Sequence, residues 1–360
     1  MLTTLVVIGC LVAAVFLFMQ QKTFGDIPSG EQLARIQQSP HYKNGTFENL
    51  SDTPMMAEQG STFKMIAAYW NKPNTEPSAP LPFVKTNLKA LESDKPVIVW
   101  FGHSSYFLKI NGKNILLDPV FSGSASPLSF MVKSYAGANE YSAEDFPELD
   151  ALILSHDHYD HLDYETIAKL IPKVKHFYTS LGVGAHLQRW GVPSSAITEL
   201  DWSESTQLSP DMSLTALPAR HFSGRGFSRG KAFWSSFALK STTHNLYLGG
   251  DSGYDTHFKE IGDKYGPFDI AILEAGQYNQ LWKLIHMMPE ETVQASLDLR
   301  AKVLMPVHWG KFTLALHPWN EPVERVFNKA KEVGQTLTTP LIGEPVVIDS
   351  VYPNKPWWRF

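Results

Sequence analysis

The alternation of hydrophobic and polar positions divides the chain into three stretches. Residues 2–19 are almost entirely apolar, whereas the next seventy or so positions are polar and rich in proline, with one apolar patch at residues 63–70. Short apolar runs separated by turns and amphipathic stretches follow to the C-terminus. We therefore predict an apolar N-terminal segment over residues 1–22, an extension over residues 23–95 that packs on the core, and one large domain over residues 96–360.

The N-terminal apolar segment predicts a membrane anchor. At about 1.5 Å per residue, residues 2–19 would form a helix of roughly 27 Å, just short of a hydrocarbon core of about 30 Å. We expect a transmembrane or signal-anchor helix, and the single nearby charge of Lys22 leaves open which side of the membrane the protein faces. A cleaved signal peptide is the main alternative, but no basic region precedes the run and no clear small-residue cleavage site follows it. A lipoprotein signal at Cys10 and a buried helix of the main domain are weaker alternatives.

The domain after residue 95 combines strands and helices. Strands are predicted at residues 97–101, 106–110, 115–117, 151–154, 214–217, 233–239, 246–248, 270–273 and 303–307. Helices are predicted at residues 163–171, 290–299 and 321–333. Strands dominate the first half and alternate with helices in the second, which favours an α/β fold with two sheets between outer helices.

The charge balance and the cysteine content narrow the function. The net charge is -5 and no long basic run occurs, so we expect no nucleic-acid partner. Cys10 is the single cysteine of the chain, which excludes an internal disulfide.

The clearest chemical signal is a cluster of histidine and aspartate directly after the predicted strand at residues 151–154. The sequence SHDHYDH at residues 155–161 places three imidazoles and two carboxylates within six positions. A loop at a strand end can turn several side chains toward one point. Imidazole and carboxylate are the ligands that zinc and similar divalent ions prefer, so we predict a metal site here.

Three later residues extend this cluster. His221, Asp251 and His308 each follow a predicted strand, so one edge of a sandwich could gather them. Asp251 comes after two glycines, which allow the backbone to approach a neighbour closely.

These motifs resemble those of the metallo-β-lactamase superfamily. The chain is most similar to its N-acyl-phosphatidylethanolamine phospholipase D and lactonase branch, over residues 97 to 334. The matching motifs are GHS at 102–104, LDPVFS at 117–122, HDHYDHLD at 156–163, PARH at 218–221, GDSGY at 250–254, HMMPEE at 286–291 and VHWG at 307–310. The resemblance implies the αββα sandwich of the metallo-β-lactamase fold.

The same resemblance implies two divalent metal ions. It assigns one ion to His156, His158 and His221, a second to Asp160, His161 and His308, and a bridging position to Asp251. Zinc is the expected metal, and manganese and iron are compatible with the same ligand types. We predict His103 to support the site rather than to bind metal.

We predict that the catalytic groups are Asp160, Asp251 and His286. In this hypothesis a hydroxide that bridges the two metals attacks phosphorus or a carbonyl carbon, and Asp160 orients it. His286 would protonate a leaving group or support a ligand. Arg225, four residues after a ligand, would clamp a substrate phosphate.

The predicted function is a membrane-associated phosphodiesterase of the phospholipase D type. It would release phosphatidic acid and an N-acylethanolamine from an N-acyl-phosphatidylethanolamine. The alternative is a lactonase or other ester hydrolase acting on a small polar metabolite, which keeps the metals and changes the bond. A scaffold protein with a vestigial site is disfavoured because every expected ligand is present. The expected partners are a lipid or small ester substrate and a membrane, and the oligomeric state stays open.

Overall fold

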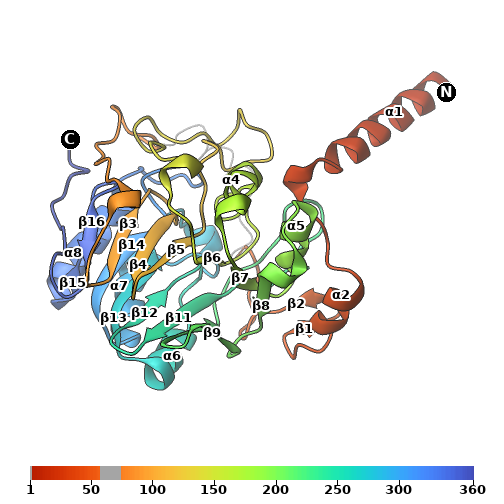
Figure 1. Ribbon diagram of the computed structural model, residues 1–360. Helices are drawn as coiled ribbons and strands as arrows, with labels where there is room; N and C mark the ends of the chain where they lie inside the picture. Colours follow the sequence, from red (N-terminus) through yellow and green to blue (C-terminus); the bar gives the residue numbers. More distant parts are fainter. Residues whose placement is uncertain (1, 57–73) are drawn as a thin grey trace.

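Two seven-stranded sheets face each other at the centre of the protein (Figure 1). The computed structural model describes residues 2–56 and 74–360, so the predicted apolar patch at residues 63–70 lies outside the described residues. The first sheet contains, in spatial order, β16 (Pro345–Val347), β3 (Val97–Trp100), β4 (Tyr106–Ile110), β5 (Lys113–Leu117), β6 (Ala151–Leu154), β7 (Phe177–Ser180) and β8 (Ile197–Leu200). The second contains β15 (Thr336–Leu337), β14 (Ala301–Val307), β13 (Phe268–Glu274), β12 (Asn245–Leu248), β11 (Ser236–Ser241), β10 (Met212–Leu217) and β9 (Ser205–Ser209).

Both sheets mix parallel and antiparallel strands in the same way. In the first sheet the pairs from β5 to β8 are parallel, and in the second the pairs from β12 to β15 are parallel. The remaining pairs are antiparallel. The inner strands are apolar at nearly every position, as expected for sheets that are covered on both faces.

Alternate residues of an inner strand belong to two different hydrophobic cores. In β3, Ile98 and Trp100 face the second sheet and join the central core, whereas Val97 and Val99 face outward into a second cluster. Because a strand turns successive side chains to opposite faces, a continuous apolar run can be buried on both sides.

Helices cover the outer face of each sheet and complete four layers. The helices of the described residues are α1 (Leu2–Met19), α2 (Gly30–Ile36), α4 (Tyr164–Leu170), α5 (Gly184–Arg189), α6 (His257–Tyr265), α7 (Pro289–Asp298) and α8 (Glu321–Val333). Helices α4 and α5 pack on the first sheet, and α6, α7 and α8 pack on the second. Short 3₁₀ turns occur at η1 (Lys22–Phe24), η2 (Leu88–Ala90), η3 (Ala143–Asp145), η4 (Ile171–Lys173), η5 (Ser194–Ala196) and η6 (Gln280–Trp282). The predicted α/β sandwich is confirmed.

Most predicted elements match the observed ones closely, with one shifted strand. The strand predicted at residues 233–239 begins only at Ser236, as β11. Phe233 instead packs in a separate cluster with Phe47 and Trp202, because the N-terminal extension folds over this part of the domain. The helix predicted at residues 163–171 is α4, and the Asp163 carboxylate caps it by accepting from the Glu165 N–H.

The N-terminal prediction needs a correction. Helix α1 is 18 residues long and projects from the body of the protein (Figure 1). Across residues 2–56 and 74–360, no helix combines the length and the apolar character that crossing a membrane requires. The predicted transmembrane helix is therefore not supported by the structure.

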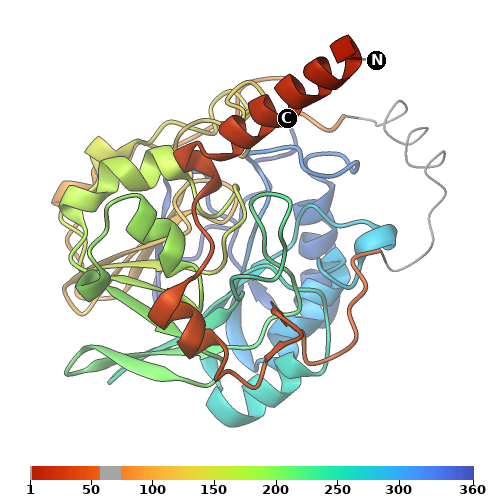
Figure 2. The ribbon, with the colours of Figure 1, turned by 90° about the vertical axis from the view of Figure 1, so that its right-hand side faces the viewer.

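The described part of the extension lies against the domain (Figure 2). It contains α2 and a two-stranded sheet of β1 (Tyr42–Lys43) and β2 (Thr46–Phe47). The Phe47 ring stacks on Phe233 with centroids 4.3 Å apart, and the Phe47 N–H donates to the Gly230 carbonyl. This hairpin brings the following residues beside the loop that starts at His221.

Candidate metal centre

The predicted ligands converge at one edge of the sandwich. The loop of residues 156–161 follows β6 in the first sheet, whereas His221, Asp251 and His308 follow β10, β12 and β14 in the second. All seven predicted ligand residues come together there, although the chain between the first and the last of them spans more than 150 positions. These residues converge because the strands that precede them end at the same edge of the sandwich.

Three histidines form a first group. The ring nitrogens of His156, His158 and His221 lie within 4.8 Å of one another. His158 Nδ1 is 2.9 Å from His156 Nε2 and 3.2 Å from His221 Nε2. Three imidazoles that converge in this way match the three-histidine sets that bind zinc.

A second group is built around Asp160. Its Oδ2 lies 3.6 Å from His161 Nε2 and 3.9 Å from His308 Nε2. His103 Nε2 is also 2.8 Å from the same oxygen, and its ring packs on His308 at 4.0 Å between centroids. His103 therefore contacts the carboxylate that the sequence predicted as a ligand, and its own ring nitrogen lies within 4.8 Å of the ligand atoms of Asp160, His161 and His308.

Asp251 lies between the two groups. Its Oδ2 is 3.2 Å from His161 Nε2, 3.7 Å from His221 Nε2 and 3.9 Å from His156 Nε2. Its Oδ1 is 3.1 Å from His308 Nδ1. Contact with both groups is the position that the predicted bridging role requires.

The glycine before Asp251 has a specific packing role. A Cβ atom at Gly250 would lie 2.6 Å from the Ser235 carbonyl oxygen and 2.9 Å from the Ser155 side chain. Such distances exclude any larger residue without movement of the backbone. The glycine pair therefore lets the Asp251 loop press against the start of the histidine-rich loop.

The residues of this centre fit divalent metal ions. The Nε2 atoms of His161 and His308 are buried and make no hydrogen bond within the described part of the chain. A buried polar atom without a partner costs free energy, and coordination to a cation would remove that cost. The imidazole and carboxylate donors belong to the types that hold zinc, iron and manganese.

The electrostatics favour the protonation states that metal binding needs at four of the predicted ligands. At His161 burial acts to lower the pKa, but the neighbouring Asp251 and Asp160 outweigh it and raise the pKa well above its ordinary value. Burial, followed by the neighbouring His161, lowers the pKa of His156 well below its ordinary value. Burial also lowers the pKa of His221 and His308. Burial acts to raise the pKa of Asp251, but His161 and His308 outweigh it and hold this pKa well below its usual range. Neutral imidazoles and ionised carboxylates are the forms that coordinate metals.

Two supporting groups were not assigned a role from the sequence. Asp118 Oδ2 lies 2.8 Å from His161 Nδ1, and the same carboxylate accepts from the Ser155 backbone N–H at 2.8 Å. His221 Nδ1 is 2.9 Å from the Ile285 carbonyl oxygen. Such contacts fix the ring orientation of metal-binding histidines. Asp118 follows β5 directly, so its position at a strand end is the signal by which the sequence could have identified it.

His286 and Glu274 form a buried pair beside the cluster. His286 Nδ1 is 3.5 Å from Glu274 Oε2, and its ring lies 5.0 Å from His221 and 5.3 Å from His308 between centroids. Burial raises the pKa of Glu274 to about 7. The structure thus places the predicted catalytic His286 at the metal cluster, and Glu274 is a neighbour that the sequence did not reveal.

Arg225 is not directed at the metal cluster. Its Nη1 donates to the carbonyls of Asp157 and Leu162, each at 2.7 Å, and its Nε and Nη2 both donate to the Thr23 carbonyl. The guanidinium also stacks over the Tyr159 ring, 4.0 Å from its centroid. Because four of the five N–H groups are already engaged, this geometry does not support the predicted phosphate clamp.

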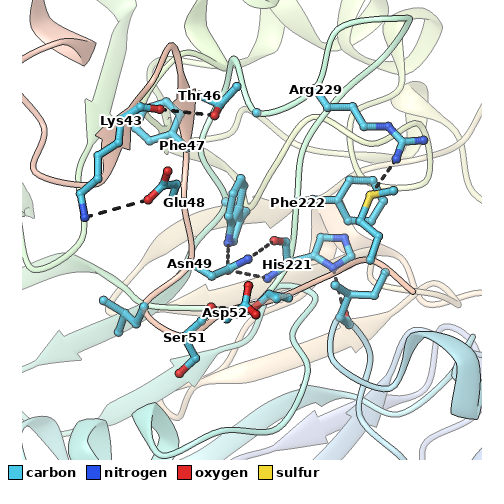
Figure 3. A pocket seen from close by; sticks show the side chains of 16 residues that line it. Lys43, Thr46, Phe47, Glu48, Asn49, Ser51, Asp52, His221, Phe222 and Arg229 are labelled. Atoms are coloured by element: carbon cyan, nitrogen blue, oxygen red, sulfur yellow. Dashed lines mark hydrogen bonds and ion pairs between the residues drawn. The ribbon is translucent and has the colours of Figure 1, made fainter. Parts of the chain in front are cut away.

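A polar pocket of about 670 Å³ reaches His221 from the surface (Figure 3). The extension forms one wall, with Asn49 and Asp52, and the loop after β10 forms the other, with Phe222 and Arg229. The pocket connects solvent to one side of the first histidine group. It provides a route by which a substrate could reach the cluster.

Comparison with known proteins agrees with this centre. Residues 113–309, more than half of the chain, match the family described as Beta-lactamase superfamily domain. An uncharacterised protein of Mycobacterium tuberculosis (strain ATCC 25618 / H37Rv) is 40% identical over 331 residues, which cover 90% of this chain and 88% of that protein.

Two further likenesses refine the placement. N-acyl-phosphatidylethanolamine-hydrolyzing phospholipase D 1 of Caenorhabditis elegans is 34% identical over 233 residues, covering 60% of this chain and 64% of that protein. In the solved structure of Igni18, a metallo hydrolase from the archaeon Ignicoccus hospitalis, 71% of this chain and 100% of that chain align with a TM-score of 0.56 and 18% identity, a likeness of fold. The chain therefore belongs to the metallo-β-lactamase superfamily, as a metal-dependent hydrolase with partial similarity to an N-acyl-phosphatidylethanolamine phospholipase D.

Proposed function

We propose that this protein is a binuclear phosphodiesterase of the phospholipase D type that hydrolyses N-acyl-phosphatidylethanolamine-like lipids. The observation that carries the proposal is the pair of histidine and aspartate groups that meet at Asp251. The identity with the nematode phospholipase supports the choice of a lipid phosphodiester over other substrates.

Two divalent ions, when bound here, would supply an activated water and neutralise charge on a phosphoryl group. His156, His158 and His221 would hold one ion, and Asp160, His161 and His308 the other, with Asp251 between them. The chain itself fixes the directions of these ligands. Asp118 orients His161, His103 orients Asp160, and the Ile285 carbonyl orients His221.

A further residue beside the cluster would handle the proton. In the proposed reaction, the oxygen of water bonds to phosphorus and the P–O bond to the ethanolamine oxygen breaks. That oxygen leaves with a proton as N-acylethanolamine, and phosphatidate remains. His286 would deliver the proton, because its ring lies beside both His221 and His308.

We further propose that the protein works at a membrane surface. The support is α1, whose apolar side chains are solvent-exposed, including Leu5, Leu11 and Leu17 at 61–68%. An exposed apolar helix next to a lipid-hydrolysing domain would keep the enzyme near its substrate. Co-sedimentation of the full chain with phospholipid vesicles tests this point, and a protein that stays in the supernatant at low salt contradicts it.

The decisive experiment is hydrolysis of N-acyl-phosphatidylethanolamine in H₂¹⁸O, followed by mass spectrometry. The zinc-loaded full chain should place ¹⁸O in phosphatidate and none in the N-acylethanolamine, because the attack is at phosphorus. A chelated sample and Asp251→Asn are the controls, and both should be inactive. If the lipid stays intact while a small lactone or ester is hydrolysed by metal-loaded protein, the alternative of a small-molecule hydrolase replaces the proposal.

A further inference from the structure

The extension reaches the metal centre through the side chain of Asn49. This residue follows the β1–β2 hairpin, which is fixed to the domain by the stacking of Phe47 on Phe233 and by the Phe47 N–H bond to the Gly230 carbonyl. The hairpin therefore fixes the position of Asn49 beside His221, in the loop after β10 (Figure 3). Residue 49 precedes the region that matches the superfamily, which begins at residue 113.

The Asn49 amide bonds both backbone groups of a predicted metal ligand. Its Nδ2 donates to the His221 carbonyl at 2.8 Å, and its Oδ1 accepts from the His221 N–H at 3.1 Å. Oδ1 also accepts from Trp234 Nε1 at 3.0 Å. Two donors at the oxygen and one acceptor at the nitrogen fix the orientation of the amide, so a single orientation makes all three contacts.

His221 needs such support because it lies outside regular structure. Strand β10 ends at Leu217, and residues 218–221 form no helix or strand. Within the described residues, no other group bonds the backbone N–H or C=O of His221. Asn49 thus takes the place of a neighbouring strand and holds this backbone as a sheet partner would.

The consequence extends to the ring of His221. With the backbone held by Asn49 and Nδ1 held at the Ile285 carbonyl, Nε2 is directed at His158 and Asp251. We infer that Asn49 is a positioning residue for His221, so that the N-terminal extension forms part of the first metal group. This inference rests on the proposed two-metal centre.

The test is a zinc titration of the metal-free full chain against a chromophoric chelator. Asn49→Ala removes all three contacts, and Asn49→Asp keeps both accepted bonds but sets a carboxylate oxygen against the His221 carbonyl. Loss of a residue that orients a ligand typically weakens metal affinity by about 10–100-fold. We expect both variants to weaken one of the two binding steps by that factor and to leave the other within about twofold.

Two controls make the result specific. Asn328→Ala, on the exposed face of α8, removes an asparagine whose side chain donates to Glu324 and should leave both steps unchanged. Circular dichroism and the Tm of the metal-free forms report folding, and Asn49→Asp decides the question if Asn49→Ala does not fold. Two unchanged steps, or two equally weakened steps, would overturn the role of Asn49. A wild-type chain that binds fewer than two ions overturns the proposed centre, and this inference with it.

Discussion

Replacing Arg225 with lysine should destabilise the fold and leave substrate binding intact. The guanidinium makes four N–H···O bonds of 2.7–3.1 Å to three carbonyls. Two of these carbonyls, from Asp157 and Leu162, belong to the histidine-rich loop and its exit, and the third, from Thr23, belongs to the segment after α1. A lysine keeps the charge but offers one nitrogen in place of the planar fork.

The size of the effect follows from the bonds that are lost. One ammonium cannot reach all three carbonyls, so at least two of the four hydrogen bonds disappear. A hydrogen bond to a charged group contributes about 1.5–3 kcal/mol. We therefore expect Arg225→Lys to lower the free energy of unfolding by about 3–6 kcal/mol, a large part of the typical 5–15 kcal/mol of a folded domain.

The assay is urea unfolding in the presence of a chelator, with KM measured separately on the metal-loaded enzyme. Arg229→Lys is the matched control, since Arg229 lies on the same loop and is exposed. It should change the free energy of unfolding by less than about 0.5 kcal/mol. Unchanged stability of Arg225→Lys together with a tenfold rise in KM would refute this reasoning and restore the phosphate clamp.

Three further predictions follow from the same structure. Asp251→Asn should lower the metal content measured by elemental analysis from two ions per chain to one or fewer, and full occupancy would contradict a bridging carboxylate. Asp118→Asn should weaken zinc binding about 10–100-fold in the chelator competition, because an amide has one acceptor oxygen and cannot replace both Oδ1, which accepts from the Ser155 backbone N–H, and Oδ2, which contacts His161 Nδ1. Burial lowers the pKa of Lys311 from 10.5 to about 7, so between these values the unfolded chain binds a proton that the folded chain lacks, and stability rises with pH. The free energy of unfolding of the wild type minus that of Lys311→Met should therefore climb by up to about 1.4 kcal/mol per pH unit above pH 7, and a flat difference would refute the low pKa.

The local pattern of the sequence was enough to predict which histidine and aspartate residues come together. The histidine-rich loop starts where the buried strand β6 ends, and the other three ligands follow β10, β12 and β14. Apolar runs of strand length and the glycines before Asp251 carried this prediction, because both features act within a few residues. Helix α8 was likewise predicted with its observed limits, owing to its strongly amphipathic pattern.

The contacts that hold these ligands could not be predicted in the same way. Asn49 bonds a histidine 172 positions away, and the guanidinium of Arg225 meets a carbonyl 202 positions away. No periodicity in the chain encodes such pairs, since they depend on how the extension folds over the finished domain. Arg225 shows the risk: its charge and its place after a ligand suggested phosphate binding, and its partners are backbone carbonyls.

The origin of the ligands in both sheets has a consequence for the lifetime of the protein. Each proposed ion would draw ligands from the loop after β6 in one sheet and from a strand end in the other. Separating the sheets would then require breaking coordination bonds, so two bound ions would link the two sheets of the sandwich. Loss of the metal ions should therefore abolish activity and also increase the rate of unfolding and of proteolysis. The abundance of the protein in the cell would then depend on the supply of metal.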